Sequence, residues 1–202
     1  MRIPLFPLNT GLFPDGVLSL RIFEVRYLKM VKSLMREDST FGVLMLEDGQ
    51  EVLQPDKREK LRRVGTLAKI TEVNTLQPAL LLIRCKGVKR FRLNNEEKGR
   101  YGLWSGEIEM VEADPSLAIP QKYEVVVNTL GKLIADMQKK INDELSMPIA
   151  PPFRLDECGW VANRWSEILP LSPKVKQDLL EEMNPSARLD RVFSLLSEFK
   201  KY

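Results

Sequence analysis

Short apolar runs fill the first half of the chain and are spaced as β-strands are. Glycine, proline, asparagine and aspartate separate the runs, and several runs alternate between apolar and polar positions, as half-buried strands do. We expect strands over 3–8, 16–22, 40–47, 64–74, 79–87, 88–93 and 101–112. Seven short strands joined by turns predict a barrel-like or sandwich arrangement.

The apolar spacing changes once within this half, at Glu24. Before it, Leu18, Leu20 and Ile22 lie two positions apart, as in a strand. After it, the apolar positions are three and four apart, as in a helix, at Tyr27, Met30 or Val31, and Leu34. A strand therefore leads into a helix here. We expect the Glu24 carboxylate to accept hydrogen bonds from the free amides of the first turn and to interact favourably with the helix dipole.

The second half follows the helical period after a break at Asp114-Pro115. An apolar stripe runs through 120–145, formed by Tyr123, Val126, Leu130, Leu133, Met137, Ile141 and Leu145. Spacings of three and four predict one long amphipathic helix over this range. The prolines of 147–153 end it, because proline lacks a backbone donor and disfavours a helical residue before it.

Three shorter helices are expected over 156–169, 173–183 and 185–199. Ser172-Pro173 and Asn184-Pro185 each place a preferred N-cap residue before a proline at the first helical position. The chain is therefore predicted to be α+β. A β-rich part with one inserted helix spans 1–116, and a helical bundle spans 117–202.

Composition narrows the possible chemistry. The chain has 202 residues, and its hydrophobic share of 44% is typical of a globular protein. It contains no histidine, which removes the commonest general base and the commonest zinc ligand. Its two cysteines, Cys85 and Cys158, lie in different kinds of segment and predict reduced core thiols. No apolar run approaches the ~20 residues that span a bilayer, so we expect a cytoplasmic protein without a membrane span.

No pattern of residues predicts catalysis. The chain's Gly-Lys pair, Gly131-Lys132, falls inside the long helix, so it forms no phosphate-binding loop. Cys85 lies between two cations, but neighbouring side chains of a strand point to opposite faces, so its thiol should not be activated. Glu107 and Glu109 share one face of a strand, as solvated carboxylates do. We therefore expect no catalytic residue, no cofactor and no metal.

Positive charge is concentrated in residues 54–100. This segment holds thirteen lysines and arginines against five acids, a net charge of +8, whereas the rest of the chain carries −5. Such a segment is usually a solvated face, but it also attracts phosphate or acidic polypeptide. Recognition of single-stranded bases usually requires aromatic side chains among the charges, and here the segment offers only Phe91. Nucleic acid is therefore the less favoured partner.

Two places are candidates for binding polypeptide. Leu12 and Phe13 lie in the turn-rich loop NTGLFPDG, where we expect them either to stay partly exposed or to cap a barrel. Arg21, Glu24 and Arg26 gather at the strand-to-helix junction, where the arginines either pair with Glu24 or present a polar edge. Trp104, Trp160 and Trp165 add large apolar area, for which a place in the core is the favoured interpretation.

The chain resembles the LON N-terminal (substrate-binding) domain family over nearly its whole length. The segments that carry the resemblance are PLFPL (4–8), LFPDGVLSLRIFEVRY (12–27), FGVLML (41–46), VGTLAKI (64–70), GVKRFRL (87–93) and WVANRWSEILPLSPKVKQDLLE (160–181). They occur in the family's order and approximate spacing. The sequence departs from the family at Val25, where many members have proline.

The resemblance implies a β-rich, PUA-like pseudo-barrel followed by a helical bundle. In ATP-dependent Lon proteases this domain precedes an ATPase module and a serine-lysine protease module, and it helps to recognise unfolded polypeptides. The chain is therefore expected to be a stand-alone, non-catalytic member that binds unfolded polypeptide. Two alternatives remain open: an adaptor for one dedicated protein partner, and an RNA-binding protein, because PUA-like architecture also occurs in that class.

Overall fold

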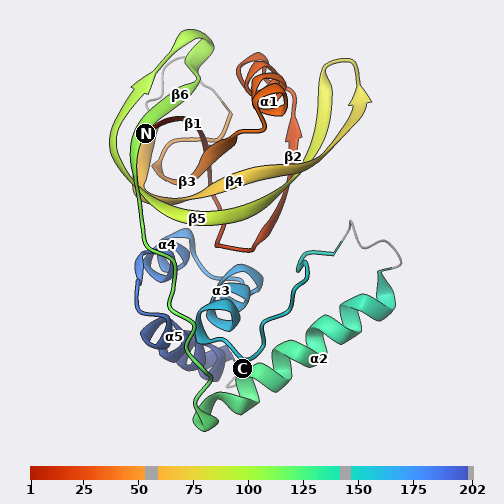
Figure 1. Cartoon of the computed structure of the whole chain (residues 1–202), viewed down its shortest axis with the longest axis vertical. Coiled ribbons are helices and arrows are strands. Elements are labelled where there is room, and N and C mark those ends of the chain that lie inside the picture. Colours follow the sequence, from red (N-terminus) through yellow and green to blue (C-terminus); the bar gives the residue numbers. More distant parts are fainter. Residues whose placement is uncertain (53–58, 142–146, 200–202) are drawn as a thin grey trace. The chain divides into compact units, whose positions relative to one another are not determined.

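The chain forms two compact units, residues 1–112 and 113–202 (Figure 1). The structure is a computed structural model that describes residues 1–52, 59–141 and 147–199.

The described residues of the first unit form six strands, one α-helix and a short 3-10 turn. The elements are β1 (Arg2–Leu8), β2 (Val17–Ile22), α1 (Val25–Glu37), β3 (Thr40–Asp48), β4 (Lys60–Gln77), β5 (Leu80–Lys98), η1 (Arg100–Gly102) and β6 (Trp104–Met110). The separate strands predicted over 79–87 and 88–93 are wrong, because both belong to β5. A shift of register opposite Thr66 and Ala68 lets β5 continue through Gly87 without a turn.

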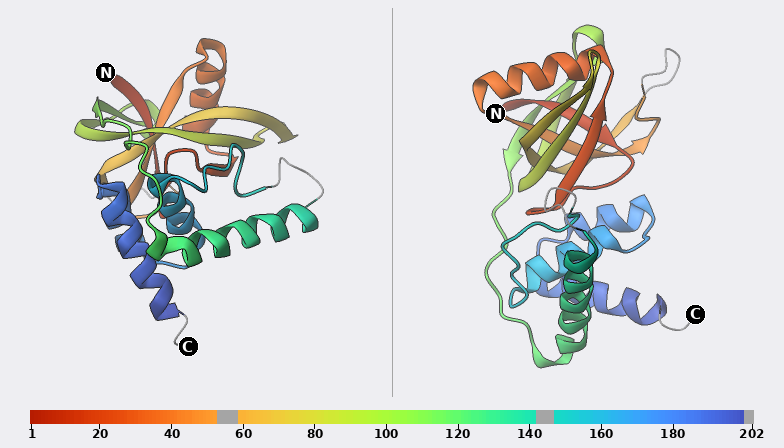
Figure 2. Two further views of the ribbon diagram at one scale, coloured as in Figure 1. Left: turned by 60° about the horizontal axis from the view of Figure 1, so that its bottom comes forward. Right: turned by 90° about the vertical axis from the view of Figure 1, so that its right-hand side faces the viewer.

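Five of these strands close into a ring, as expected for a pseudo-barrel (Figure 2). The order around the ring is β5, β4, β3, β1 and β6, with β6 returning to β5. The β1–β3 pair is parallel and the other pairs are antiparallel. One edge of β5 pairs with β4. The other edge pairs with β2 over Leu81–Lys86 and with β6 over Phe91–Lys98, so two strands share it.

Two clusters of buried apolar side chains fill this unit. One lies under α1, which contributes Tyr27, Met30, Val31 and Leu34 against side chains of β1, β2, β3 and β5. The other gathers residues of β1, β3, β4, β5 and β6 around Phe91. Gly65 is needed inside the barrel, since a Cβ there would lie 2.3 Å from the Val43 carbonyl oxygen and 2.9 Å from the Phe91 ring.

The second unit is helical, as predicted. Its elements are η2 (Gln121–Tyr123), α2 (Glu124–Lys140), α3 (Cys158–Ile168), α4 (Pro173–Glu181) and α5 (Pro185–Phe199). Ser172 caps α4 by accepting a hydrogen bond from Val175 N, and Asn184 accepts bonds from Ser186 N and Ala187 N at the start of α5. Both predicted caps are confirmed. Among the described residues, no helix has the length and apolar character that crossing a membrane requires.

The apolar stripe of α2 matches the predicted stripe only in part, since Leu133, Met137 and Ile141 are half-buried and the helix ends at Lys140, before the prolines that were predicted to end it. Tyr123, Val126 and Leu130 are buried, but the next buried residue is Ile134. Leu145 lies outside the described residues. Trp160 and Trp165 of α3 are buried, which confirms their interpretation as core residues.

A buried arginine joins distant parts of the second unit. Both terminal nitrogens of Arg188 donate to the carboxylate of Asp114, at 2.7 and 3.0 Å, and one of them also donates to Asn163 Oδ1. Arg188 Nε and Nη2 donate further to the Glu182 carbonyl oxygen. A charged group without solvent is costly unless it is paired and hydrogen-bonded, and this one is both. The network therefore fixes the first residues of the unit against α3 and α5.

Two glycine-to-alanine substitutions should have opposite effects on stability. Gly65→Ala places a methyl group against a backbone oxygen and should lower the free energy of unfolding by about 2 kcal/mol. Gly131→Ala, inside α2, meets only Leu155 at 3.5 Å and should raise it by about 0.5–1 kcal/mol through helix propensity. Urea unfolding measures both. A neutral Gly65→Ala variant would contradict the close packing of β3, β4 and Phe91.

Candidate functional site

A pocket of about 240 Å³ opens in the first unit where the strand-to-helix junction meets β1. Its walls come from the end of β1, from β2, from the start of α1 and from the residues that follow β3. The lining residues are Phe6, Leu8, Ser19, Leu20, Arg21, Phe23, Glu24, Tyr27, Glu51 and Val52. Arg21 and Glu24 were predicted as candidates, and the structure places both at this pocket.

The pocket exists because the strand pairing leaves a gap. β6 pairs with β1 only over Arg2–Leu5, so the edge of β1 beyond Leu5 is released from β6. β2 pairs with β5, and within the described parts of the chain it has no second partner strand. Phe6 and Leu8 of β1 and Ser19 and Leu20 of β2 therefore line the same opening without a strand between them.

Arg26 is a buried structural residue and not a surface contact. Its side chain is 3% exposed. Nε and Nη2 donate to the two carboxylate oxygens of Glu24, Nη1 donates to the Gly102 carbonyl oxygen at 3.0 Å, and Nη2 donates to the Glu51 carbonyl oxygen at 3.1 Å. The guanidinium also lies over the Tyr27 ring, 4.4 Å from its centroid. Arg26 thus ties the start of α1 to the segments after β3 and before β6.

The predicted hydrogen bonds from first-turn amides to the Glu24 carboxylate are wrong. Glu24 is the N-cap residue of α1, and its carbonyl oxygen accepts the first helical hydrogen bonds, from Tyr27 N and Leu28 N. Its side chain makes no cap hydrogen bond. The physical reason is the guanidinium of Arg26, which engages both carboxylate oxygens in a charge-assisted pair stronger than a bond to a neutral amide. Glu24 therefore serves as the counter-ion of Arg26 in the wall of the pocket.

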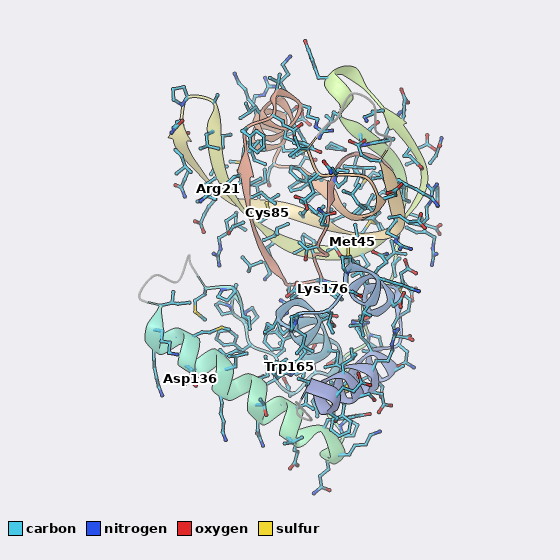
Figure 3. The ribbon with its side chains drawn as sticks, turned by 180° about the vertical axis from the view of Figure 1, so that it is seen from behind. Arg21, Met45, Cys85, Asp136, Trp165 and Lys176 are labelled. Carbon is cyan, nitrogen blue, oxygen red and sulfur yellow. The ribbon has the colours of Figure 1, made fainter. Side chains whose placement is uncertain are left out.

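Arg21 is exposed and has no ion-pair partner among the described residues. It lies on β2, where Figure 3 labels it, and it is one of the polar residues that line the pocket. Phe23 and Val52 border the same pocket and are 52% and 51% exposed. Exposed apolar side chains contribute contact area to a bound ligand, and a cation beside them contributes selectivity for its charge.

Leu12 and Phe13 do not reach this pocket. They are 2% and 0% exposed, so of the two predicted alternatives the structure excludes the exposed one. The hydroxyl of Thr66 donates to the Leu12 carbonyl oxygen at 2.6 Å, and the Phe13 carbonyl oxygen lies against Gly87. These contacts hold the loop against the barrel wall and bury both side chains.

The floor of the pocket is aromatic. Tyr27 stacks on Phe6 with ring centroids 4.0 Å apart. Burial raises the pKa of the Tyr27 hydroxyl well above its ordinary value of 10.0, so the ring stays neutral throughout the physiological range. Sequence reasoning missed Phe6, Leu8, Glu51 and Val52 as pocket residues. Only the pairing of strands far apart in the chain brings them there, and no local motif marks them.

The groups that were considered for catalysis lie in ordinary structural settings. Cys85 is buried, and burial raises the pKa of its thiol to about 12, which disfavours the nucleophilic thiolate. Glu107 and Glu109 are exposed on β6, as predicted. In the described part of the chain, no three acidic or cysteine side chains gather closely enough to hold a metal ion.

Many cations of the positive segment take part in ion pairs, several of them with acids of the same segment. Among the described residues, seven of its cations face a carboxylate: Lys60 and Arg62 face Glu47, Arg63 faces Glu96, Lys69 faces Asp38, Arg84 faces Glu72, Lys86 faces Asp15 and Lys98 faces Glu59. Phe91 is fully buried, so it offers no surface for base stacking. These contacts weaken the case for nucleic-acid binding. Lys57 and Arg58 lie outside the described residues.

Substitution of Arg26 should affect folding, whereas substitution of Arg21 should not. Arg26→Met keeps the apolar stem but leaves Glu24 and two backbone carbonyl groups without their donor, which should cost about 2–3 kcal/mol of stability. Arg21→Met should change it by less than about 0.5 kcal/mol, as exposed substitutions usually do. Urea unfolding of the two variants is the measurement. Equal losses, or an unchanged Arg26→Met variant, would contradict the structural role of Arg26.

Comparison with known proteins identifies the family. The model of the ATP-dependent protease La (LON) substrate-binding domain matches residues 2–198. The Lon protease of Aquifex aeolicus (strain VF5) is 26% identical over 96% of this chain and 24% of its own length. The Lon protease of Koribacter versatilis (strain Ellin345) is 28% identical over 94% of this chain and 23% of its own length. The chain spans about a quarter of the length of these curated relatives.

Solved structures agree with the fold. The crystal structure of a Lon N-terminal domain protein from Xanthomonas campestris matches with a TM-score of 0.74 and 27% identity, covering 96% of this chain and 98% of that one. The N-terminal domain of a Mycobacterium avium complex Lon protease matches with a TM-score of 0.63 and 17% identity, which supports the fold alone. With a family match that spans nearly all of its residues, the chain belongs to the LON substrate-binding domain family.

Proposed function

We propose that the chain binds unfolded polypeptide, and that it does so at the pocket between β1 and β2. The observation that carries the proposal is the combination at this pocket of exposed Phe23 and Val52 with Arg21, an exposed arginine that has no ion-pair partner among the described residues. The family description, a substrate-binding domain, supports the same reading. Leu12, Phe13 and Arg26 are left out of the contact surface because they are buried.

The size of the pocket favours part of a polymer over a small molecule. Drug-sized ligands occupy pockets of about 300–1,000 Å³, which enclose most of their surface. The volume here, about 240 Å³, is smaller and opens to solvent at Phe23 and Val52. It fits one or two side chains of a longer chain that continues across the surface.

The chain itself contributes recognition and not catalysis in this proposal. Support comes from the absence of histidine in the sequence and from the buried Cys85 thiol, whose pKa is raised to about 12. Any proteolysis would belong to other parts of the relatives that carry the name Lon protease. We further propose a cytoplasmic location, supported by two buried free cysteines that are typical of reducing compartments.

Removal of the exposed aromatic side chain at the pocket should weaken polypeptide binding. Phe23→Ser deletes apolar contact area and should reduce the affinity for fluorescein-labelled, reduced and carboxymethylated α-lactalbumin by about tenfold, a typical loss for a central contact. Fluorescence anisotropy measures the binding. The melting temperature should change little, since the side chain is half-exposed.

Leu76→Ser is the matched control. Leu76 is 50% exposed, almost as much as Phe23, but it lies near the end of β4 and does not line the pocket. This variant should bind as the unaltered chain does. If Leu76→Ser weakened binding as much as Phe23→Ser, or if neither variant changed it, the pocket would not be the site.

A further inference from the structure

The outer edge of β2 presents unpaired backbone groups at the pocket. In an antiparallel pair, residues that exchange hydrogen bonds with the partner strand alternate with residues whose backbone groups point away from it. Gly87 N donates to the carbonyl oxygen of Gly16, directly before β2, at 2.8 Å, which fixes where this alternation begins. Given the register of β2 with β5, the backbone N–H and C=O groups of Leu18, Leu20 and Ile22 then point toward β5.

The intervening residues of β2 point the other way. By the same alternation, the backbone N–H and C=O groups of Val17, Ser19 and Arg21 face away from β5. An independent contact agrees with this assignment. The Arg84 carbonyl group, opposite Ser19, accepts a hydrogen bond from the Thr71 hydroxyl on the β4 side of β5, so it does not point toward β2.

No described strand of the chain occupies this edge. Across residues 1–52, 59–141 and 147–199, no strand other than β5 pairs with β2. Neither Ser19 nor Arg21 has another recorded backbone hydrogen bond in those ranges. Both residues line the pocket, so the unpaired backbone groups and the open volume lie at the same place.

From this edge, together with the proposed function on which it rests, we infer that β2 binds an extended polypeptide segment as an added strand. Main-chain hydrogen bonds to Ser19 and Arg21 hold the segment, and its alternate side chains enter the pocket. The walls that meet those side chains include Phe6, Leu8 and Tyr27, which favour apolar residues.

The charges at the pocket determine which residues suit the remaining positions of the bound segment, whose side chains do not enter the pocket. Glu24 is paired with Arg26, and the Glu51 carboxylate accepts a hydrogen bond from Asn9 N. Arg21 has no such partner among the described residues. An opposite charge directly across a strand pair is stabilising, so the side chain beside Arg21 is acidic. The segment that fits therefore alternates apolar and acidic residues.

A charged residue on an edge strand also has a protective role in many proteins, because it discourages unwanted strand pairing. Arg21 alone would fit that role. The pocket beside Arg21 is not explained by that role, because protection from strand pairing requires no open volume next to the edge. The coincidence of free backbone groups, an apolar-walled pocket and an unpaired cation is what favours a bound segment.

The first arm of the test uses a fluorescein-labelled nine-residue peptide of alternating valine and aspartate, with the unaltered full chain. Each backbone nitrogen of the peptide is methylated in turn, and binding is measured by fluorescence anisotropy. Methylation removes a donor and blocks strand pairing at that residue. Strand addition requires a loss of about tenfold or more at every second position of the paired stretch and a small change between them.

The second arm exchanges charges. Arg21→Glu should bind the valine–aspartate peptide at least about tenfold more weakly and should bind a valine–lysine peptide more tightly than the unaltered chain does. Lys89→Glu is the control, because Lys89 is exposed on β5 and does not line the pocket. It should leave the preference for aspartate over lysine in place.

The outcomes separate this inference from the proposed function. Peptide binding that depends on Phe23 but shows no period of two in the methylation series would overturn strand addition and leave the polypeptide site standing. An unchanged charge preference in Arg21→Glu would overturn the acidic specificity. If neither peptide nor the unfolded α-lactalbumin bound, the proposed function and the inference would both fall.

Discussion

The edge of β5 that two strands share determines the architecture of the first unit. β5 is 19 residues long, and its first half pairs with β2 while its second half pairs with β6. The same stretch of this edge cannot pair with both strands. β6 therefore closes the ring by pairing with the first residues of β1, whereas β2 stays outside the ring. The gap between β1 and β2 is the direct result, and the pocket occupies that gap.

A gap in a barrel wall needs something to hold its borders in place, and Arg26 does this. Its guanidinium binds Glu24 at the start of α1 and the carbonyl groups of Glu51 and Gly102. Burial of a charge is favourable only when its hydrogen-bonding groups find partners, and these contacts supply them. The three charged residues at the strand-to-helix junction thus have different roles. Arg26 and Glu24 maintain the junction, and Arg21 stays available at the surface.

Local patterns in the sequence predicted the structural features that neighbouring residues determine, such as the starts of helices. The change of spacing at Glu24 located the start of α1, and the pairs Ser172-Pro173 and Asn184-Pro185 located α4 and α5, since caps act within one turn. The helical period predicted the second part, and the resemblance to a known family specified a pseudo-barrel for the first. These features needed no knowledge of which distant segments meet.

Features that depend on distant contacts were not predictable in this way. Gly87 looked like a turn between two strands, but it is the position where β5 passes closely against the Phe13 carbonyl group. The burial of Leu12 depends on the hydroxyl of Thr66, 54 positions away. The burial of Arg26 depends on Gly102, 76 positions away. No local pattern encodes such partners, so the sequence left both an exposed and a buried alternative open for the loop, and both an ion pair and a polar edge open for Arg26.

The central claim is that polypeptide binds along β2, and amide hydrogen exchange measured by NMR tests it most directly. In the free chain the amides of Ser19 and Arg21, which lack a backbone acceptor in the described structure, should exchange rapidly, and the amide of Leu20, bonded to β5, should exchange slowly. A saturating unfolded polypeptide should slow exchange at Ser19 and Arg21 by about tenfold or more, as new hydrogen bonds do. Bound polypeptide that left both rates unchanged would contradict the account.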